Sequence, residues 1–306
     1  MSYKNFNCLE CGEEFGESKK LHMHLRSHKI IMGNYYVKHY PRKSLFDGEL
    51  IPFKTLEQYM GSYFFDDAER DKWLESASTE RVQAFLLKTF KDAFNKNNNE
   101  ALTYNDIASS RLPSVESCIK TFSSYGSMCK QLGVKVTLAK RIPSDFWTAD
   151  LSKMTIMIDT REQTPFVYRN SISSKIDIGD YTAMGDDYDY TYVDRKAKGD
   201  FISTLSKANF ERFKKEMQRV RDLESQIYVV VEAPIKEIKE RKSFNRKQAS
   251  VEHIFHNMRE IQREFSDVCQ FVFADNVEHA REITARILKC GKNIWGVDLQ
   301  YFINNR

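Results

Sequence analysis

The chain has 306 residues, 41% of them hydrophobic and 13% aromatic, so it can bury at least one full core, which excludes an intrinsically disordered protein. Its 47 basic and 43 acidic side chains leave a net charge of +4, which alone does not indicate a nucleic-acid partner. No apolar run approaches the roughly 20 residues of a membrane-spanning helix, and the first residues lack the pattern of a secretory signal. We therefore expect no membrane partner and an intracellular protein, cytoplasmic or nucleoid-associated, or nuclear in a eukaryote.

A metal-binding pattern lies near the start of the chain. It consists of two cysteines and two histidines: Cys8, Cys11, His24 and His28. The two pairs are separated by twelve residues, a spacing that brings two thiolates and two imidazoles to one tetrahedral Zn²⁺. The other four cysteines are scattered, which indicates reduced thiols rather than a disulfide framework. Because all four coordination positions are filled, we expect a structural zinc ion.

Residues 1–30 resemble a Cys2His2 zinc finger, with Phe15 and Leu21 at the positions of its small core. The resemblance implies a ββα fold and three residues that face DNA bases: Glu17, Lys20 and Met23. A role as a folding staple or as a protein contact stays open, because this segment carries only about one net positive charge.

Residues 31–77 are rich in Tyr, Phe and Asp without a clear period, and we interpret them as a linker that packs on its neighbours. Residues 78–150 are predicted to form a helical DNA-binding module. Its first helix is indicated by apolar residues three or four positions apart: Val82, Phe85, Leu86, Phe90 and Phe94. The polar run at 95–99 is expected to end this helix.

Two shorter helices follow in the same module. Thr103 and Asp106 form a capping-box-like start for the first, and Pro113 precedes the second. Residues 112–133 resemble the homing-endonuclease-associated repeat, a small helical module that contacts DNA, although Ser123 stands where that family usually has glycine.

This helix pair would lie against a groove, with three lysines at the phosphates: Lys120, Lys130 and Lys135. Its core would be formed by three apolar residues: Ile119, Phe122 and Leu132. The alternative is a plain helical connector with a solvated basic face.

Residues 151–306 combine apolar strands with helices. Five strands are predicted: 154–158, a run ending at 176–178, 190–193, 227–231 and 269–273. Three helices are predicted: one around 210–220, one at 251–265 and one at about 277–289. Early strands followed by strands that alternate with helices predict a mixed α/β sheet covered on both faces.

Acidic and basic side chains follow three of these strands. The three strand ends are Asp159–Glu162, Gly179–Tyr181, and Val193–Lys196 with Asp200 shortly after. Alternate residues of a strand share one side, so Asp194 and Lys196 project together while Arg195 points away. Carboxylates supply the hard oxygen ligands that Mg²⁺ or Mn²⁺ requires, and a nearby ammonium group can hold the attacking water. The set predicts metal-dependent hydrolysis of phosphodiesters.

These motifs resemble XPF-type nucleases of the PD-(D/E)xK superfamily, whose hallmarks are Asp-x-Arg-Glu, Gly-Asp-aromatic and Glu-Arg-Lys-x-x-x-Asp. The resemblance implies a mixed-sheet, restriction-endonuclease-like domain in which Asp180 and Asp194 bind the metal and Lys196 positions water. It also implies further site residues in supporting roles: Asp159, Arg161, Glu162, Arg195 and Asp200. Asp194 stands where the family has Glu, which moves the carboxylate oxygens back by about one methylene.

Family members in eukaryotes usually carry a tandem helix-hairpin-helix domain after the nuclease, and this sequence has none before it ends at Arg306. We therefore expect the N-terminal modules, self-association as a homodimer or an unidentified protein partner to position the DNA.

Two basic segments are candidates for the DNA path. The helix after the third motif contributes Lys207, Arg212, Lys214, Lys215 and Arg219. The following loop contributes Lys236, Lys239, Arg241, Lys242, Arg246 and Lys247. We interpret the loop as a phosphate clamp, and its alternative is a solvated, mobile connection.

Together the patterns predict a Mg²⁺-dependent DNA endonuclease that leaves a 5′-phosphate and a 3′-hydroxyl. We expect it to act at branched or otherwise specific DNA structures in repair, recombination or replication. Two alternatives stay open: a sequence-guided homing-type endonuclease of a mobile element, and a catalytically inactive DNA-binding platform.

Overall fold

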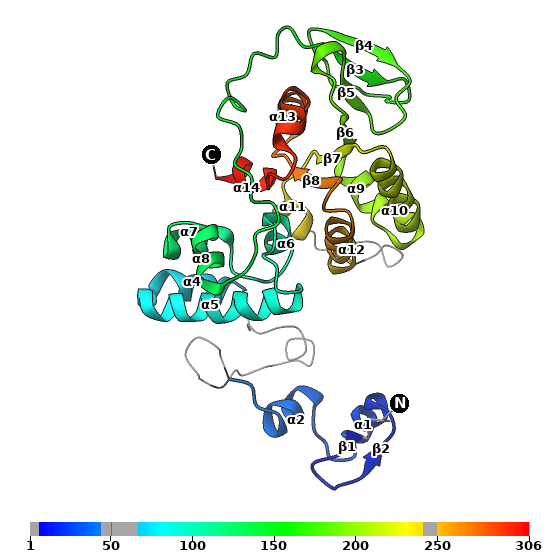
Figure 1. The fold of residues 1–306 in the computed structure, drawn as a ribbon. Helices are drawn as coiled ribbons and strands as arrows, with labels where there is room; N and C mark the ends of the chain where they lie inside the picture. Colours follow the sequence, from blue (N-terminus) through cyan, green and yellow to red (C-terminus); the bar gives the residue numbers. More distant parts are fainter. Residues whose placement is uncertain (1–5, 44–49, 51–66, 241–249, 306) are drawn as a thin grey trace. The chain divides into compact units, whose positions relative to one another are not determined.

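The computed structural model describes residues 6–43, 50, 67–240 and 250–305. The chain divides into two compact units, each described by itself: Met1–Asp92 with Glu116–Met128, and Ala93–Val115 with Cys129–Arg306 (Figure 1). None of the helices in the described ranges is long and apolar enough to cross a membrane.

The first unit begins with a ββα arrangement. The strands β1 (Phe6–Asn7) and β2 (Glu14–Phe15) pair antiparallel and are followed by α1 (Ser18–His24). Leu21 on α1 is buried, and Phe15 packs against the same apolar cluster. The two residues therefore lie in the small core that the sequence predicts for a finger.

A further helix, α2 (Met32–His39), completes this core. The ring of Tyr35 is fully buried, and its hydroxyl accepts a hydrogen bond from the Leu9 amide at 2.9 Å. The same hydroxyl donates to the carbonyl of Asn7 at 3.3 Å. The first part of the segment interpreted as a packing linker thus forms a helix on the finger, because thirty residues bury little apolar surface by themselves.

The described helical segments that follow are α4 (Asp67–Ser76), α5 (Thr79–Lys96), α7 (Val115–Phe122) and α8 (Tyr125–Leu132). The apolar positions predicted for α5 are all buried: Val82, Phe85, Leu86, Phe90 and Phe94. Asn98 and Asn99 have φ values of +52° and +64°, a left-handed conformation that ends a helix, as predicted.

The turn between α7 and α8 places Ser123 at φ +66°, a conformation for which glycine is the usual residue. The predicted core of this helix pair is wrong. The buried residues of the two helices are Val115, Cys118, Tyr125, Met128 and Cys129, whereas Ile119, Phe122 and Leu132 are half-buried. Helical periodicity fixes a stripe only to about one residue, and packing selects the neighbouring stripe here.

Six strands form the mixed sheet of the second unit: β3 (Ile156–Asp159), β4 (Ser171–Ser174), β5 (Tyr181–Ala183), β6 (Thr191–Lys196), β7 (Gln226–Val231) and β8 (Cys269–Phe273). Their order is β4-β3-β5-β6-β7-β8. β5 runs antiparallel to both of its neighbours, and the other adjacent pairs are parallel. The predicted mixed α/β sheet is confirmed.

The predicted end of the second strand, at 176–178, is wrong, because β4 already ends at Ser174. This segment is a connection between β4 and β5, in which Ile176 and Ile178 are buried. Gly179 follows with φ +64°, which turns the chain into β5. The two isoleucines therefore anchor a turn on the core, and their burial imitates the apolar alternation of a strand.

Helices cover both faces of the sheet (Figure 1). Along β7, Ile227, Val229 and Val231 join one core and Tyr228 and Val230 join the other, as expected for alternating side chains. The first core includes α9 (Lys198–Thr204), α10 (Lys207–Asp222), α11 (Ile235–Lys239) and α12 (Val251–Glu264). The second includes α13 (Val277–Cys290), the 3-10 turn η2 (Gly291–Ile294) and α14 (Leu299–Asn304).

The short helix α6 (Tyr104–Ala108) belongs to this second unit. It begins with the predicted capping box, in which the side chains of Thr103 and Asp106 each accept a hydrogen bond from the backbone amide of the other. The Tyr104 amide donates to Asp298 at 2.7 Å, and Asp298 is also the N-cap of α14. One carboxylate therefore caps α14 and binds the start of α6.

Candidate functional site

The antiparallel direction of β5 brings three reactive side chains to the same end of the central strands of the sheet. Asp180 directly precedes β5, whereas Asp194 and Lys196 lie in the second half of β6. Because the two strands pair antiparallel, with Tyr181 opposite Val193, the start of β5 lies beside the end of β6. The prediction that Asp180 ends a strand is therefore wrong, although its position beside the other two residues follows from the same pairing.

Asp180 is held on both sides by the sheet. Its amide donates to the carbonyl of Val193 at 2.8 Å, and its own carbonyl accepts from the Asp159 amide at 2.8 Å. One carboxylate oxygen accepts from the amide of Arg195 at 2.8 Å. Burial, and then the nearby charge of Asp194, raise the pKa of Asp180 well above its usual range. The site therefore contains a carboxyl group whose ionised form is disfavoured.

Asp194 and Lys196 form an ion pair on one side of β6. Lys196 Nζ donates to Asp194 Oδ1 at 2.5 Å, and Asp194 is only 4% exposed. Burial alone would lower the pKa of Lys196, but the adjacent carboxylate of Asp194 raises it above its usual value. Lys196 is therefore a permanent ammonium group at neutral pH.

These three residues line an open pocket of about 570 Å³. The rest of its wall comes from the segments before β5 and from α10: Arg161, Asp177, Ile178, Gly179, Arg212, Lys215, Glu216 and Arg219. On α10, the buried residues Phe213, Met217 and Val220 face the core. The polar stripe beside them therefore forms one wall of the pocket.

Glu216 is a pocket residue that no sequence motif marks. It lies four positions after Arg212 and three before Arg219, on the polar stripe of α10. A charged residue on such a stripe is ordinarily solvated, so the sequence gives no reason to select it. Partial desolvation in the pocket, and then the charge of Asp194, raise the pKa of Glu216 above its usual value.

Asp159 has a different environment from Asp180. Its carboxylate accepts from Arg161 Nε at 2.6 Å, from the Arg161 amide at 2.8 Å and from the Ile176 amide at 2.7 Å. Burial would raise the pKa of Asp159, but these hydrogen bonds outweigh it and lower the pKa to about 2. Asp159 does not line the pocket; it fixes Arg161, which does.

Arg195 points to the opposite side of β6, as the alternation of a strand predicts. Its guanidinium donates to Glu232 at 2.6 Å and to Glu162 at 3.3 Å. It also donates to the carbonyl of Thr164 and lies over the ring of Phe166, 4.6 Å from the centroid. Arg195 and Glu162 thus bind the ends of β6, β7 and the segment after β3 together, and neither lines the pocket.

The donor set of the pocket fits Mg²⁺ or Mn²⁺. Magnesium is typically held by one or two protein carboxylates, with water and substrate phosphate oxygens completing its shell. Asp180 and Asp194 offer two carboxylates side by side, and burial, followed by the charge of Asp194, raises the pKa of Asp180. A divalent cation between them would relieve the repulsion between the two carboxylates.

The other predicted DNA-contact residues differ in where they lie. Lys207 is exposed and does not line the pocket, and Lys20, Lys120 and Lys130 are exposed on their own helices. Asp200, predicted as a supporting residue of the catalytic site, is also exposed outside the pocket. Lys214 is turned toward α12, with its ammonium 2.8 Å from Glu260 and 2.5 Å from Glu264. Lys239 donates to the carbonyl of Ser110 at 2.5 Å. Four members of the predicted clamp lie outside the described residues: Arg241, Lys242, Arg246 and Lys247.

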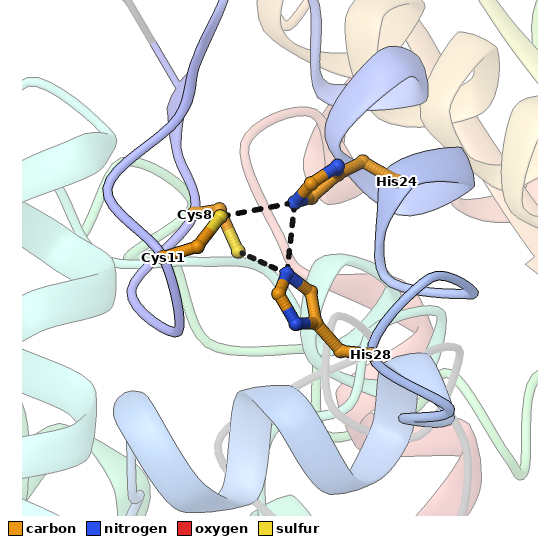
Figure 2. Close-up of side chains that lie close together, drawn as sticks. All are labelled: Cys8, Cys11, His24 and His28. Carbon is orange, nitrogen blue, oxygen red and sulfur yellow. Dashed lines mark hydrogen bonds between the residues drawn. The ribbon is translucent and has the colours of Figure 1, made fainter.

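The four residues of the predicted zinc site converge in the first unit (Figure 2). Their ligand atoms all lie within 4.8 Å of one another. Cys11 Sγ is 3.2 Å from His24 Nε2, and Cys8 Sγ is 3.7 Å from His28 Nε2. Glu13 lies 3.3 Å from His24 Nδ1, where it can orient the ring. Two thiols and two imidazoles in this arrangement fit a structural zinc ion with no open coordination position.

A mixed six-stranded sheet with two aspartates and a lysine at one end of its central strands defines the second unit as a nuclease-like α/β domain. Residues 158–287 match the family model of the ERCC4 domain, which confirms the predicted XPF-type domain in this part of the chain. The match does not extend to the zinc site or to the helical module.

Two solved structures of XPF from Aeropyrum pernix are similar to this chain at 17% identity. The first covers 44% of this chain and 63% of its own, with a TM-score of 0.34. The second, a complex with DNA, covers 50% of this chain and 67% of its own, with a TM-score of 0.33. This chain thus spans less than two thirds of the first structure. A search of curated proteins found no match.

Proposed function

We propose that this protein is a divalent-metal-dependent DNA endonuclease that acts at branched or otherwise structured DNA. The observation that carries the proposal is the convergence of Asp180, Asp194 and Lys196 in one pocket. The match of residues 158–287 to the ERCC4 domain supports it.

The two aspartates have the role of holding the metal. When bound, Mg²⁺ supplies Lewis-acid stabilisation of the phosphate and lowers the pKa of a coordinated water. Lys196 donates a hydrogen bond to the attacking water and holds it in line with the scissile phosphorus. Hydrolysis in this sense leaves a 5′-phosphate and a 3′-hydroxyl.

The cations around the pocket have the role of binding the DNA strand. Arg212, Lys215 and Arg219 follow one another at helical spacing along α10, so that they meet successive phosphates. Arg161 reaches the same pocket from the other side, with its guanidinium fixed by Asp159. The zinc finger and the helical module add contacts to DNA outside the nuclease domain.

A substrate panel tests this function. Purified protein is incubated with linear duplex, nicked, flap, fork and four-way-junction DNA, with and without Mg²⁺. We expect Mg²⁺-dependent cleavage of the branched substrates, and loss of cleavage with retained DNA binding in Asp180→Asn and Lys196→Ala. Asp186→Asn is the matched control, because this exposed aspartate lies after the far end of β5.

The same panel identifies the alternatives. Cleavage of linear duplex at a fixed sequence would replace the proposal by a homing-type endonuclease. DNA binding without cleavage of any substrate would replace it by an inactive binding platform. Wild-type cleavage by Asp180→Asn would exclude this pocket as the active site.

A further inference from the structure

Three tyrosines gather at the start of β6, at the opposite end of that strand from Lys196. We refer to Tyr188, Tyr190 and Tyr192 as the tyrosine patch. The ring centroids of Tyr188 and Tyr190 are 5.1 Å apart, and those of Tyr188 and Tyr192 are 6.2 Å apart. Tyr188 is 39% exposed and Tyr190 is 47% exposed. Single exposed tyrosines are ordinary on a protein surface, but a contiguous group of rings is typical of an interaction site.

The tyrosine patch is held in place by hydrogen bonds. The hydroxyls of Tyr188 and Tyr192 share one at 2.8 Å. The backbone carbonyl of Tyr190 accepts another from the Gln226 amide at 3.0 Å. Tyr190 has φ +66°, a left-handed conformation that ends the strand alternation directly before β6 begins. The rings are therefore presented from a hydrogen-bonded backbone, which reduces the entropy that is lost when a ligand binds.

The tyrosine patch lies on the same side of the sheet as the reaction pocket. Tyr192, Asp194 and Lys196 alternate along β6 and therefore project from one face. Tyr192 packs against the core that includes α10, and α10 forms one wall of the pocket. Two residues of a strand span roughly 7 Å, which is about the rise of two stacked nucleotides in one strand of DNA. A DNA strand bound at Asp194 can therefore reach Tyr192 within a few nucleotides.

The basic side chains of α10 lead from the pocket toward the tyrosine patch. Arg212, Lys215 and Arg219 line the pocket in that order along the helix. The helix is followed, after a connection of three residues, by Gln226 at the start of β7. Because Gln226 is hydrogen-bonded to Tyr190, the C-terminal end of α10 lies near the patch. A DNA backbone that follows these cations past Arg219 would thus bring its next bases to the tyrosines.

The charges around the tyrosine patch also suit a nucleic acid. Lys292 Nζ lies 4.6 Å from the centroid of the Tyr190 ring, where it can meet the phosphate beside a stacked base. Two neighbouring carboxylates are engaged within the protein. Asp187 pairs with Lys289 at 2.8 Å, and Asp189 accepts from the Lys292 amide at 2.5 Å. Exposed rings beside a cation are the components of surfaces that bind single-stranded nucleic acids.

We propose that the tyrosine patch stacks unpaired nucleobases of the DNA strand that is held in the pocket. This inference rests on the proposed function and adds a base-contacting surface to it. Every nucleobase has a face that can stack on an aromatic ring, so the surface binds without regard to sequence. Bases inside a duplex are already stacked on their neighbours and cannot use it. The patch therefore selects DNA in which the strand is unpaired close to the scissile phosphate.

Binding to strands with and without bases tests the assignment. Fluorescence anisotropy, in buffer without divalent metal, measures the affinity of the full-length protein for a dT oligonucleotide, an abasic strand of equal length and a blunt duplex. Two double variants are compared with wild type. The leucine pair, Tyr188→Leu with Tyr190→Leu, removes both exposed rings, and the phenylalanine pair, Tyr188→Phe with Tyr190→Phe, keeps them.

The expected result is a loss that depends on both rings and bases. We expect the leucine pair to bind the dT strand about tenfold or more weakly than wild type, because stacked bases contribute much of the affinity for single strands. The phenylalanine pair should bind it as wild type does. All three proteins should bind the abasic strand equally and the duplex equally, which also shows that the variants are folded.

A fluorescent base gives a second measurement. The fluorescence of 2-aminopurine falls when this base stacks on an aromatic ring. Its signal within the dT strand should therefore fall on binding to wild type and to the phenylalanine pair, and should fall less on binding to the leucine pair.

Three results overturn the proposal. Equal affinity of wild type and the leucine pair for the dT strand would assign the tyrosine patch to a protein partner or to a second copy of the chain. An equal loss of affinity for the abasic strand would show that the rings do not act through bases. A phenylalanine pair as weak as the leucine pair would show that the hydroxyls, rather than the rings, are required.

The binding result is independent of cleavage. If no DNA substrate is cut but the leucine pair still loses affinity for the dT strand alone, the proposed function fails and the stacking surface stands. If wild type cleaves DNA and the leucine pair binds the dT strand normally, the function stands and the stacking surface fails.

Discussion

Asp159, the last residue of β3, is joined to Asp180, which directly precedes β5, by a hydrogen bond of 2.8 Å from the amide of Asp159 to the carbonyl of Asp180. Their side chains nevertheless have opposite environments. Hydrogen bonds from Arg161 and Ile176 outweigh burial and lower the pKa of Asp159 to about 2. Burial and Asp194 raise the pKa of Asp180. The ionised carboxylate of Asp159 stabilises the fold. The ionised carboxylate of Asp180 is unfavourable, and a bound metal ion would offset this cost.

We predict that Asp180→Asn stabilises the metal-free protein. A carboxyl whose folded pKa is raised to about 8 binds its proton more tightly in the folded than in the unfolded state. Its unfavourable contribution is absent below the unfolded pKa of 3.8 and grows as the pH rises toward 8. The melting temperature of the variant should therefore exceed that of wild type by more at pH 8 than at pH 5, measured by calorimetry in a chelator. A lower melting temperature at pH 8 would contradict this account.

Asp159→Asn is predicted to have the opposite effect. The lowered pKa means that the ionised carboxylate stabilises the folded state above pH 3.8, and that this stabilisation is lost as the pH falls through about 2. Loss of the charge should reduce the free energy of unfolding by about 2 kcal/mol at neutral pH. Urea unfolding at pH 7, followed by the far-UV signal, measures it. A variant as stable as wild type would contradict the stabilising role of the ionised Asp159 carboxylate.

Lys196→Met should separate metal binding from chemistry. Methionine has a similar length, and it frees Asp194 from its ion pair, so Mg²⁺ affinity should stay equal or increase. Cleavage should fall by about 100-fold or more, because the attacking water loses its positioning group. Lys198→Met is the control, since Lys198 pairs with Glu237 away from the pocket. Reduced metal affinity in Lys196→Met would mean that Lys196 contributes to metal binding, which would contradict a role limited to positioning the water.

Gly179→Ala is expected to disturb the site through the backbone. A Cβ at this position would lie 2.8 Å from the carbonyl of Val193, and the residue has φ +64°. We expect a loss of about 2 kcal/mol or more in stability and a marked loss of cleavage, because Asp180 is the next residue. Gly199→Ala is the matched control, since its Cβ would meet no atom within 4 Å. Equal stability of both variants would indicate that the turn before β5 adapts.

Zinc removal should affect the finger alone. We expect a single zinc ion per chain, released by a zinc-selective chelator with loss of the helical signal of α1 and α2, because such fingers are unfolded without metal. Cys11→Ser should have the same effect. The unfolding transition of the nuclease domain should stay unchanged in both cases, which differential scanning calorimetry can measure. A wild-type protein that binds no zinc would exclude this site.

Local patterns were enough to predict several elements. The stripe of Val82, Phe85 and Phe90 predicted α5, and Thr103 with Asp106 predicted the start of α6, because helical periodicity and capping involve residues a few positions apart. The run at 176–178 misled for the same reason. Two buried isoleucines in a turn show the same local pattern as two in a strand.

The roles of individual charged residues required contacts between distant segments. Lys214 and Lys215 are equivalent by sequence, yet Lys214 pairs with Glu260 while Lys215 lines the pocket. Asp159 and Asp180 likewise both border strands, and the hydrogen bond that Asp159 accepts from the distant Ile176 amide distinguishes them. No short window of sequence contains these pairs of residues.

The sequence by itself determined the classes of element, the XPF-like motifs and the four side chains suited to zinc. These features depend on residue types at fixed spacings along one segment. Only the tertiary structure decided that β5 runs against its neighbours, that Asp180 therefore meets Asp194 and Lys196, and that Glu216 lines the same pocket from α10. Strand direction and the choice of helix face are decided by long-range packing, because the free energy of burial depends on which surfaces meet rather than on which residues are adjacent in the chain.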